Sequence, residues 1–306
     1  MIGVFGDINL DISAKIKRFP RPDDEVYIHE IKQVLGGTGA NTAVAINRLG
    51  RETMLIGAVG DDHEGETLLK KMHDEGLKAA VREIPGKHTG YCFAAFDDKG
   101  NRRLFSYRGA NLAYEMDEDA LDIFRKCSMI HVTGGYPEFW EVMKTMIETG
   151  ALKATFSFDP GSMSCEAWPQ QVLRFSETVD LLFISMNEVK ILGEKHLLLP
   201  DTLRILKMGA DGGIVYRHDK RIAKWNAIRR RQVDSTAAGD VFNAGVITGL
   251  DMALSIDESL RIGAVAAAIS VTRAGAQSSI PNLEEVRKLY AEVYGSDLYA
   301  RKGDNS

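Results

Sequence analysis

The sequence reads Asp234-Ser235-Thr236-Ala237-Ala238-Gly239-Asp240 and then enters the apolar run 241–247. Small residues stand where a turn would enter a helix, and a carboxylate falls in the first helical turn. The first backbone N–H groups of a helix lack partners within it, and the helix dipole adds partial positive charge there. Because Ala237, Ala238 and Gly239 leave those donors uncovered, an anionic oxygen can approach them closely.

The carboxylate of Asp240 would lie beside this anion site, where it is poorly placed to bind a phosphate but well placed to accept a proton. A proton acceptor next to an anion site is what phosphoryl transfer to a hydroxyl requires. The alternative interpretation is structural, because small residues commonly precede helices and an acid in the first turn complements the dipole. This stretch taken alone leaves both interpretations open.

A second stretch reads Gly36-Gly37-Thr38-Gly39-Ala40-Asn41-Thr42-Ala43. Consecutive glycines let the backbone come close to a polyhydroxy ligand, and Asn41 offers a donor and an acceptor for vicinal hydroxyls. The alternative is a glycine-rich loop that serves only as a tight entry into a helix. Two common nucleotide-binding fingerprints are missing: G-x-G-x-x-G at the opening strand, and the P-loop throughout the chain.

Length and composition are those of a globular protein with one large domain or two small ones, at 306 residues with 44% apolar and 26% charged. The net charge of −5 argues against nucleic-acid and membrane-surface partners, which need a basic face. Three cysteines, an odd number without any C-x-x-C, predict reduced thiols. The N-terminus lacks the basic segment of a signal peptide. We therefore expect a cytoplasmic protein with no nucleic-acid or membrane partner.

Hydrophobic patterning predicts strands and helices in alternation along most of the chain. Apolar segments predict strands at 2–6, 53–59, 129–133, 155–158, 181–184, 202–207 and 213–216. Helices are expected at 40–49 and 64–75, and another begins at Asn282 with Glu285 in capping-box spacing. This alternation indicates an α/β fold, a doubly wound and mostly parallel sheet with helices on both faces.

Two strand-rich segments, about 10–35 and 88–110, do not fit that alternation. Segments 90–96 and 102–107, joined by the turn Asp97-Asp98-Lys99-Gly100, predict a hairpin. We expect the two segments to pair as a small β-sheet that forms a lid over the cleft at the edge of the main sheet. Residues 1–306 would then form a single domain with the lid inserted in it.

Both signature stretches resemble those of the ribokinase-like (PfkB) family of sugar and nucleoside kinases. Segment 234–240 is similar to D-T-x-G-A-G-D, from which Ser235 and Ala237 depart, and segment 36–43 matches G-G-x-G-x-N-x-A without a departure. The resemblance extends from Gly6 to Pro281. It implies transfer of the γ-phosphoryl group of ATP, with Mg²⁺ and room for a monovalent cation, to a primary hydroxyl of a sugar or nucleoside. Because alanine replaces glycine at Ala237, we expect this position to avoid a positive φ.

Through this resemblance each matching residue gains an expected role. Asp240 is the expected base, and the N–H groups of Ala237, Ala238 and Gly239 together with that of Asp240 form the anion hole. The residues expected to hold the acceptor are Asp11, Gly37, Asn41 and Asn111. The residues expected to hold the nucleotide are Asn187, Lys207 (which replaces a threonine), Gly209, Gly212 and Gly275.

One departure concerns the metal. The family carries N-x-x-E to position hydrated Mg²⁺, whereas this chain reads Asn187-Glu188-Val189-Lys190. Lys190 cannot bind a cation, although it can neutralise phosphate charge. Glu188 stands two residues early and would point elsewhere on a helix. The residues that would position the metal therefore stay unassigned.

Three arginines, Arg102, Arg103 and Arg108, cluster beside the predicted hairpin. On a strand Arg102 and Arg108 share a face and Arg103 points oppositely. They form either a solvated edge or, with Arg108 at the substrate, a clamp for an anionic acceptor such as fructose 6-phosphate or 2-keto-3-deoxygluconate.

Three aromatic residues, Tyr136, Phe139 and Trp140, follow Gly134-Gly135 at the end of the strand predicted at 129–133. Their side chains either stack on a nucleoside base or pack in the core. The sequence is also compatible with a non-catalytic sugar- or nucleotide-binding protein, which would carry the same fold. A homodimer could form through the lid.

Overall fold

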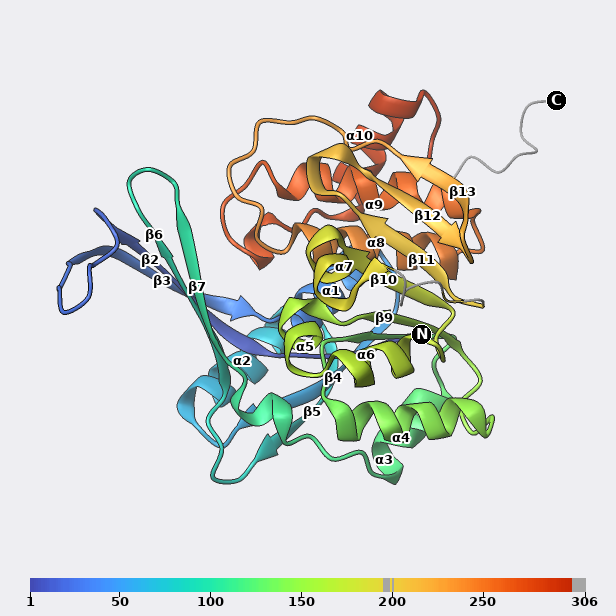
Figure 1. Cartoon of the computed structure of the whole chain (residues 1–306), viewed down its shortest axis with the longest axis horizontal. Coiled ribbons are helices and arrows are strands. Elements are labelled where there is room, and N and C mark those ends of the chain that lie inside the picture. The colour runs from blue at the N-terminus through green and yellow to red at the C-terminus, as the bar shows by residue number, and fades with distance from the viewer. Residues whose placement is uncertain (195–198, 200, 299–306) are drawn as a thin grey trace.

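The computed structural model describes residues 1–194, 199 and 201–298. Its main sheet has nine strands in the order β13-β12-β11-β10-β9-β8-β1-β4-β5 (Figure 1). The strands are β1 (Ile2–Gly6), β4 (Thr53–Gly60), β5 (Lys78–Ile84), β8 (Met129–Thr133), β9 (Thr155–Asp159), β10 (Leu181–Ser185), β11 (Leu203–Lys207), β12 (Gly213–Arg217) and β13 (Lys220–Trp225). The pairs from β10–β11 through to β4–β5 are parallel, which confirms the predicted mostly parallel sheet.

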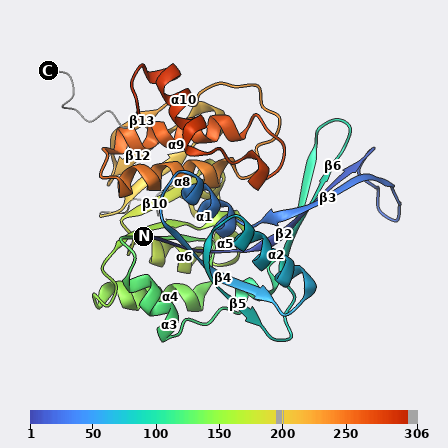
Figure 2. The same ribbon diagram turned by 180° about the vertical axis from the view of Figure 1, so that it is seen from behind.

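Helices cover both faces of this sheet, as Figures 1 and 2 show from opposite sides. One layer consists of α1 (Thr38–Arg48), α2 (His63–Asp74), α8 (Ala238–Asp251), α9 (Ile256–Ser270) and α10 (Leu283–Tyr294). The other consists of α3 (Glu118–Arg125), α4 (Pro137–Glu148), α5 (Gly161–Ala167), α6 (Pro169–Ser176) and α7 (Met186–Leu192). Strand side chains alternate between the two layers, so Val4 belongs to one core and Phe5 to the other. This two-sided burial explains why the strands read as continuous apolar runs.

Helices α8 and α9 approach each other backbone to backbone. A Cβ atom added at Gly245 would lie 2.6 Å from the Cα of Gly263, and one at Gly249 would lie 2.7 Å from the Cα of Ser259. These distances are shorter than any real Cβ contact, so glycine is required at both positions. The helix that carries Asp240 is thereby seated directly on α9.

The sequence predictions for the sheet were wrong in two respects. Strands β5 and β13 were missed, and the segment at 213–216 was expected to continue the parallel sheet. Instead β12 pairs antiparallel with both β11 and β13. Only 208–212 separate β11 from β12, and a parallel crossover needs about a dozen residues or more.

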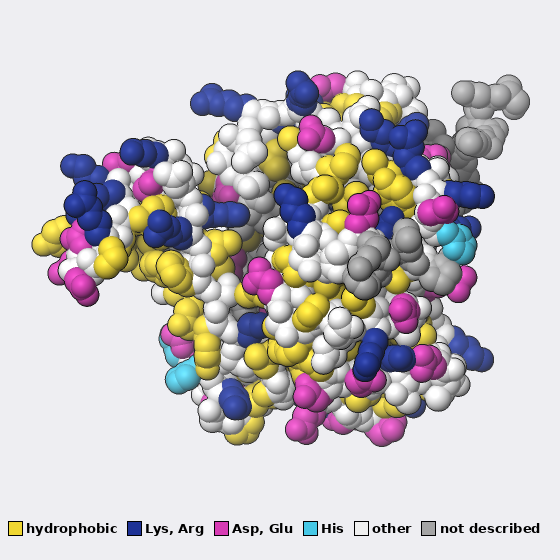
Figure 3. Space-filling model, in the orientation of Figure 1, with side chains coloured by type: hydrophobic (Ala, Val, Ile, Leu, Met, Phe, Trp, Pro, Cys, Tyr) yellow, Lys and Arg dark blue, Asp and Glu magenta, His cyan; other side chains and the backbone are white. Residues whose placement is uncertain are grey.

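A second sheet of four strands has the order β3-β2-β6-β7 and projects from the body (Figure 1). Its strands are β2 (Asn9–Ile16), β3 (Ile28–Gly36), β6 (Gly90–Phe96) and β7 (Arg102–Tyr107). The predicted hairpin is confirmed, because β6 and β7 pair antiparallel. Figure 3 shows hydrophobic side chains gathered on this lid, which exposes Ile31, Leu104 and Phe105 among others.

Two further properties bear on the environment of the chain. In the part of the chain that the structure describes, no helix combines the length and apolar composition needed to cross a bilayer. The three cysteines are free thiols, with Cys127 and Cys165 buried and Cys92 half-buried in the lid.

Candidate active site

The loop that precedes α8 positions the predicted anion hole. Ala237 is the N-cap residue and adopts φ 61°, ψ 2°, in the left-handed region. The expectation that alanine avoids a positive φ here was therefore wrong. The Ala238 N–H donates to the Ser235 carbonyl at 3.2 Å, whereas those of Gly239 and Asp240 precede the first intrahelical bond, from Val241 to Ala237. The donors closest to the carboxylate thus remain for an anion.

Replacing Ala237 by glycine is expected to raise the free energy of unfolding by about 0.5–1 kcal/mol. The left-handed region costs an L-residue roughly 1–2 kcal/mol, part of which is offset by the greater freedom of glycine in the unfolded chain. Urea denaturation measures the change. Ala253→Gly tests the same effect at a second position, because Ala253 also has a positive φ, 57°, just beyond the far end of α8, and a similar gain is expected there. A loss of stability in Ala237→Gly would contradict this account.

Asp240 lies in the first turn of α8 and meets the glycine-rich stretch. The amide Nδ2 of Asn41 donates to Asp240 Oδ2 at 3.0 Å, so residues 199 positions apart are brought together. Burial raises the pKa of Asp240 to about 7; the neighbouring carboxylates of Asp159 and Asp11 also raise it, while Asn41 and Lys207 act in the opposite direction. A carboxylate with a pKa near neutrality is suited to accept a proton from a hydroxyl.

Three of the residues predicted to hold the acceptor, Asp11, Gly37 and Asn41, lie near one another and close to Asp240. Burial raises the pKa of Asp11, on β2, to about 7. The Oδ1 atom of Asn41 is buried without a hydrogen-bond partner, which leaves an acceptor for a ligand hydroxyl. Gly37 caps α1 with φ 90°, and a Cβ there would lie 2.3 Å from the Asp7 carbonyl oxygen, so only glycine fits.

Asn111 has a different environment from the one expected. Its Oδ1 accepts from the Ile8 N–H at 2.9 Å, and its Nδ2 donates to Asn9 Oδ1 and the Arg108 carbonyl, both at 2.9 Å. The amide is thus engaged within the protein. This geometry favours a role in fixing the start of β2 over direct contact with an acceptor.

Arg108 is also engaged. Its Nη2 and Nε contact the two carboxylate oxygens of Asp7 at 2.6 and 3.0 Å, and its Nη1 donates to the Gly135 carbonyl at 2.8 Å. The side chains of this pair are only 11% and 10% exposed. Since a bidentate carboxylate neutralises the guanidinium, an anionic acceptor would have to displace Asp7.

The other two arginines and the three aromatic residues lie in different environments. Arg102 reaches from the lid to the anion loop, where Nη1 donates to Thr236 Oγ1 at 3.1 Å. Arg103 stacks over Phe19 within the lid, with its guanidinium carbon 4.4 Å from the ring centre. The aromatic side chains of Tyr136, Phe139 and Trp140 are buried in the core, which supports the packing interpretation over stacking on a base.

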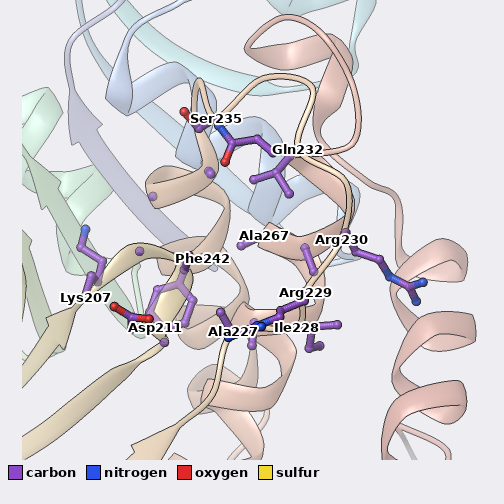
Figure 4. Close-up of a pocket in the computed structure, with 18 of the residues that line it drawn as sticks. Lys207, Asp211, Ala227, Ile228, Arg229, Arg230, Gln232, Ser235, Phe242 and Ala267 are labelled. Carbon is purple, nitrogen blue, oxygen red and sulfur yellow. The ribbon is translucent and has the colours of Figure 1, made fainter.

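A cavity of about 450 Å³ opens beside the anion loop, within the range of small-molecule sites. Its walls include Phe242 of α8, Ala267 of α9, and Ala227 and Ile228 of the segment after β13 (Figure 4). Lys207 lies at one end, whereas the Arg230 side chain extends away and pairs with Glu292. Small and apolar walls with a polar end fit a flat heterocycle that carries phosphates.

The residues predicted to hold a nucleotide fall into two groups. Lys207, Gly209 and Gly212 line the cavity. Gly275 donates its N–H to Asp234 Oδ2 at 2.9 Å, which ties the chain after α9 to the anion loop. Asn187 lies apart from the cavity lining, on the exposed start of α7, and donates to Ser162 Oγ at 3.1 Å.

The residues that the structure describes give Mg²⁺ no protein cage. Within residues 1–194, 199 and 201–298, no group of three His, Cys, Asp or Glu side chains could hold a metal ion. Glu188 turns back to cap α7, where its Oε2 accepts from the Ser185 N–H at 2.6 Å, so it does point away as expected. Lys190 lies on the same helix and is exposed.

Sequence reasoning missed three residues beside the site: Asp7, Asp159 and Asn243. Asp159 ends β9, and its Oδ2 accepts from Lys207 Nζ at 2.5 Å and from Asn243 Nδ2 at 2.6 Å. The signal was present, because an acid at the carboxyl end of a parallel strand stands where α/β proteins bind ligands.

Comparison with known proteins places this geometry in a family. Residues 1–283 match the family described as pfkB family carbohydrate kinase. The chain belongs to the pfkB family. Ribokinase of Lactococcus lactis is 28% identical over 303 residues, covering 95% of this chain and 97% of the relative. A nucleoside kinase of Methanothermobacter thermautotrophicus is 26% identical over 298 residues and covers 95% of each chain.

The fold agrees with this membership. The solved structure of Arabidopsis thaliana ribokinase complexed with ribose and ATP has a TM-score of 0.84 and 25% identity, covering 94% of this chain and 98% of that one. The pfkB protein described here is a sugar or nucleoside kinase of the ribokinase type. The open alternative of a non-catalytic binding protein therefore loses its support.

Proposed function

We propose that this kinase transfers the γ-phosphoryl group of ATP to a primary hydroxyl of a neutral sugar or nucleoside. The observation that carries the proposal is the carboxylate of Asp240, which is held by Asn41 and directly follows Gly239, a residue of the cavity lining, at the open N–H groups of α8. The relatives support the same chemistry, since the ribokinase of Arabidopsis thaliana was solved with ribose and ATP.

In this reaction Asp240 accepts the proton of the acceptor hydroxyl. As that proton leaves, the hydroxyl oxygen forms a bond to the γ-phosphorus, and the bond from phosphorus to the bridging oxygen breaks, its electron pair leaving with ADP. The N–H groups of Gly239 and Asp240 lie where negative charge develops on the phosphoryl oxygens. Asp11, Gly37 and Asn41 fix the acceptor, and closure of the lid excludes water.

Lys207, Gly209 and Gly212 bind the nucleotide in the cavity, and Gly275 supports the loop from behind. Asn187 was predicted to bind the nucleotide as well, and it would reach the phosphates only from outside the cavity lining. Mg²⁺, when bound, neutralises charge on the nucleotide phosphates, which ordinarily supply most of its ligands together with water. The same proposal includes the binding of a monovalent cation and the formation of a homodimer through the lid.

The neutral acceptor follows from the ion pair of Arg108 with Asp7, because the arginine that was expected at the substrate is already neutralised by a carboxylate. The test is ADP release from Mg·ATP with ribose, fructose, adenosine, inosine, cytidine, fructose 6-phosphate and 2-keto-3-deoxygluconate. We expect turnover with one of the five neutral acceptors. Turnover restricted to the two anionic acceptors, and lost on substitution of Arg102 and Arg108, would overturn this assignment.

The pH profile tests the base. Asp240 must be ionised to accept a proton, and its pKa is raised to about 7, so kcat/KM is expected to fall about tenfold per pH unit below pH 7. Asp11 also has a raised pKa of about 7, so the apparent value belongs to the pair. A profile that stays flat from pH 5 to pH 9 would contradict the assignment.

A further inference from the structure

A nearly buried cation, the side chain of Lys207, lies at one end of the cavity. Lys207 ends β11 with its side chain 17% exposed, and its Nζ lies 2.5 Å from Asp159 Oδ2 and 3.3 Å from Asn243 Oδ1. An ammonium group has three protons. These two acceptors leave one of them for a ligand, and Lys207 is also part of the cavity lining.

The three partners form a closed triangle across three elements. Asn243 lies one turn after Asp240 on α8, and its Nδ2 donates to the same Asp159 oxygen at 2.6 Å, while Asp159 ends β9. Each side chain therefore fixes the other two. A lysine side chain otherwise has high rotamer freedom, which this arrangement has already removed before a ligand binds.

The ammonium group also adjoins the anion hole. A Cβ atom placed on Gly239 would lie 3.9 Å from Lys207 Nζ, and apart from the adjoining residues and the backbone of α8 no other heavy atom would come within 4 Å. The space beside the Gly239 backbone is thus open except on the side of the lysine. An oxygen bound there would lie between backbone N–H groups and a fixed positive charge.

The surrounding carboxylates keep this lysine charged. Burial alone would lower the pKa of Lys207, but the carboxylates of Asp159, Glu188 and Asp240 outweigh it and hold the pKa above its usual value. The ammonium group in turn lowers the pKa of Asp240. Lys207 therefore acts on both the anion hole and the proton acceptor.

We propose that Lys207 is a further catalytic residue that contacts the terminal phosphate of the bound nucleotide, and that Asp159 and Asn243 are positioning residues that hold its ammonium group there. The inference rests on the proposed function, because it needs a nucleotide in the cavity. It gives the site a fixed positive charge that belongs to the protein itself. The alternative is a purely structural ion pair, which would contribute to stability without contacting a ligand.

The experiment compares the affinity of the protein for ADP and for the non-hydrolysable ATP analogue AMPPNP by titration calorimetry with Mg²⁺. We expect Lys207→Met to lose about tenfold more affinity for AMPPNP than for ADP, since a charge-assisted hydrogen bond to the terminal phosphate disappears. Lys224→Met, at an exposed position of β13, is the matched control and is expected to leave both affinities unchanged. If Lys207→Met does not fold, Lys207→Gln serves with the same expectation.

Asp159→Asn tests the positioning role, because it removes the anionic partner and keeps the shape of the side chain. Asp159→Asn is expected to reproduce the selective loss of affinity for AMPPNP. Asp159→Glu keeps the negative charge and is expected to show a smaller loss of this affinity. Equal losses for both ligands, or a lower melting temperature with an unchanged ratio of affinities, would overturn the inference and leave the proposed function intact. A wild-type protein that binds neither ligand would overturn both.

Discussion

Replacing Asp240 by asparagine is expected to lower kcat by about 10²–10⁴-fold, the range that general base catalysis contributes. The carboxylate is the group at the anion hole that can accept the proton of a hydroxyl, and its pKa of about 7 suits that task near neutral pH. Asparagine keeps the size and one carbonyl oxygen but cannot take up the proton. Steady-state kinetics with saturating acceptor and ATP measure the effect.

The melting temperature and the ADP affinity of the same variant show whether it is folded. Above pH 7 the wild-type protein holds an ionised carboxylate against the effect of burial, so Asp240→Asn is expected to have the higher melting temperature at pH 8. That advantage should diminish as the pH falls through 7 toward the pKa of an exposed carboxyl group, where the wild-type side chain becomes neutral in both states. ADP affinity should be retained. Near wild-type turnover in this variant would rule out Asp240 as the base.

Replacing Asp7 by alanine is expected to lower the free energy of unfolding by about 3–5 kcal/mol, because it leaves a buried guanidinium group without its carboxylate. Both members of the pair are almost inaccessible to solvent, and the contact is bidentate. It also joins the start of the lid at Asp7 to its end at Arg108. Urea denaturation at pH 7 measures the loss.

The matched double variant separates the cost of an unpaired charge from the value of the pair. In the Asp7→Ala background, Arg108→Leu should recover part of the lost stability, because no charge then stays buried. Asp122→Ala breaks an exposed pair with Arg125 and should change stability little. A loss under about 1 kcal/mol in Asp7→Ala would show that water reaches Arg108.

How far the sequence predicts this fold depends on where a strand lies in the sheet. The seven inner strands were all found, and the central ones, such as β1, β8 and β10, are buried on both faces and read as apolar runs. The two that were missed, β5 and β13, are the two edges of the nine-stranded sheet. Each carries charged residues, as in Lys220-Arg221-Ile222-Ala223-Lys224-Trp225, and such residues protect an edge from pairing with another chain. The charged residues that protect an edge strand also interrupt the apolar pattern by which a strand is predicted.

The candidate site was predictable where a motif is local in sequence. The two signature stretches placed Asp240 and Asn41 in one site, and the structure joins them by a hydrogen bond. The roles of Arg108 and Asn111 could not be inferred, because their partners Asp7 and Ile8 lie about a hundred residues away. The conformation of Ala237 was missed for another reason: the loop imposes a positive φ that side-chain preference alone would oppose.

The glycine contacts between α8 and α9 have a mechanical consequence. Because Gly245 and Gly263 have no side chains, the backbones of the two helices approach closely, and Val246 and Phe242 of α8 pack directly against Gly263. Helices packed this closely cannot slide past each other without opening a void. We therefore expect α8 to keep its position during the catalytic cycle. The movement that closes the site is then expected to come from the lid. The lid already contacts the loop before α8 through the hydrogen bond from Arg102 to Thr236.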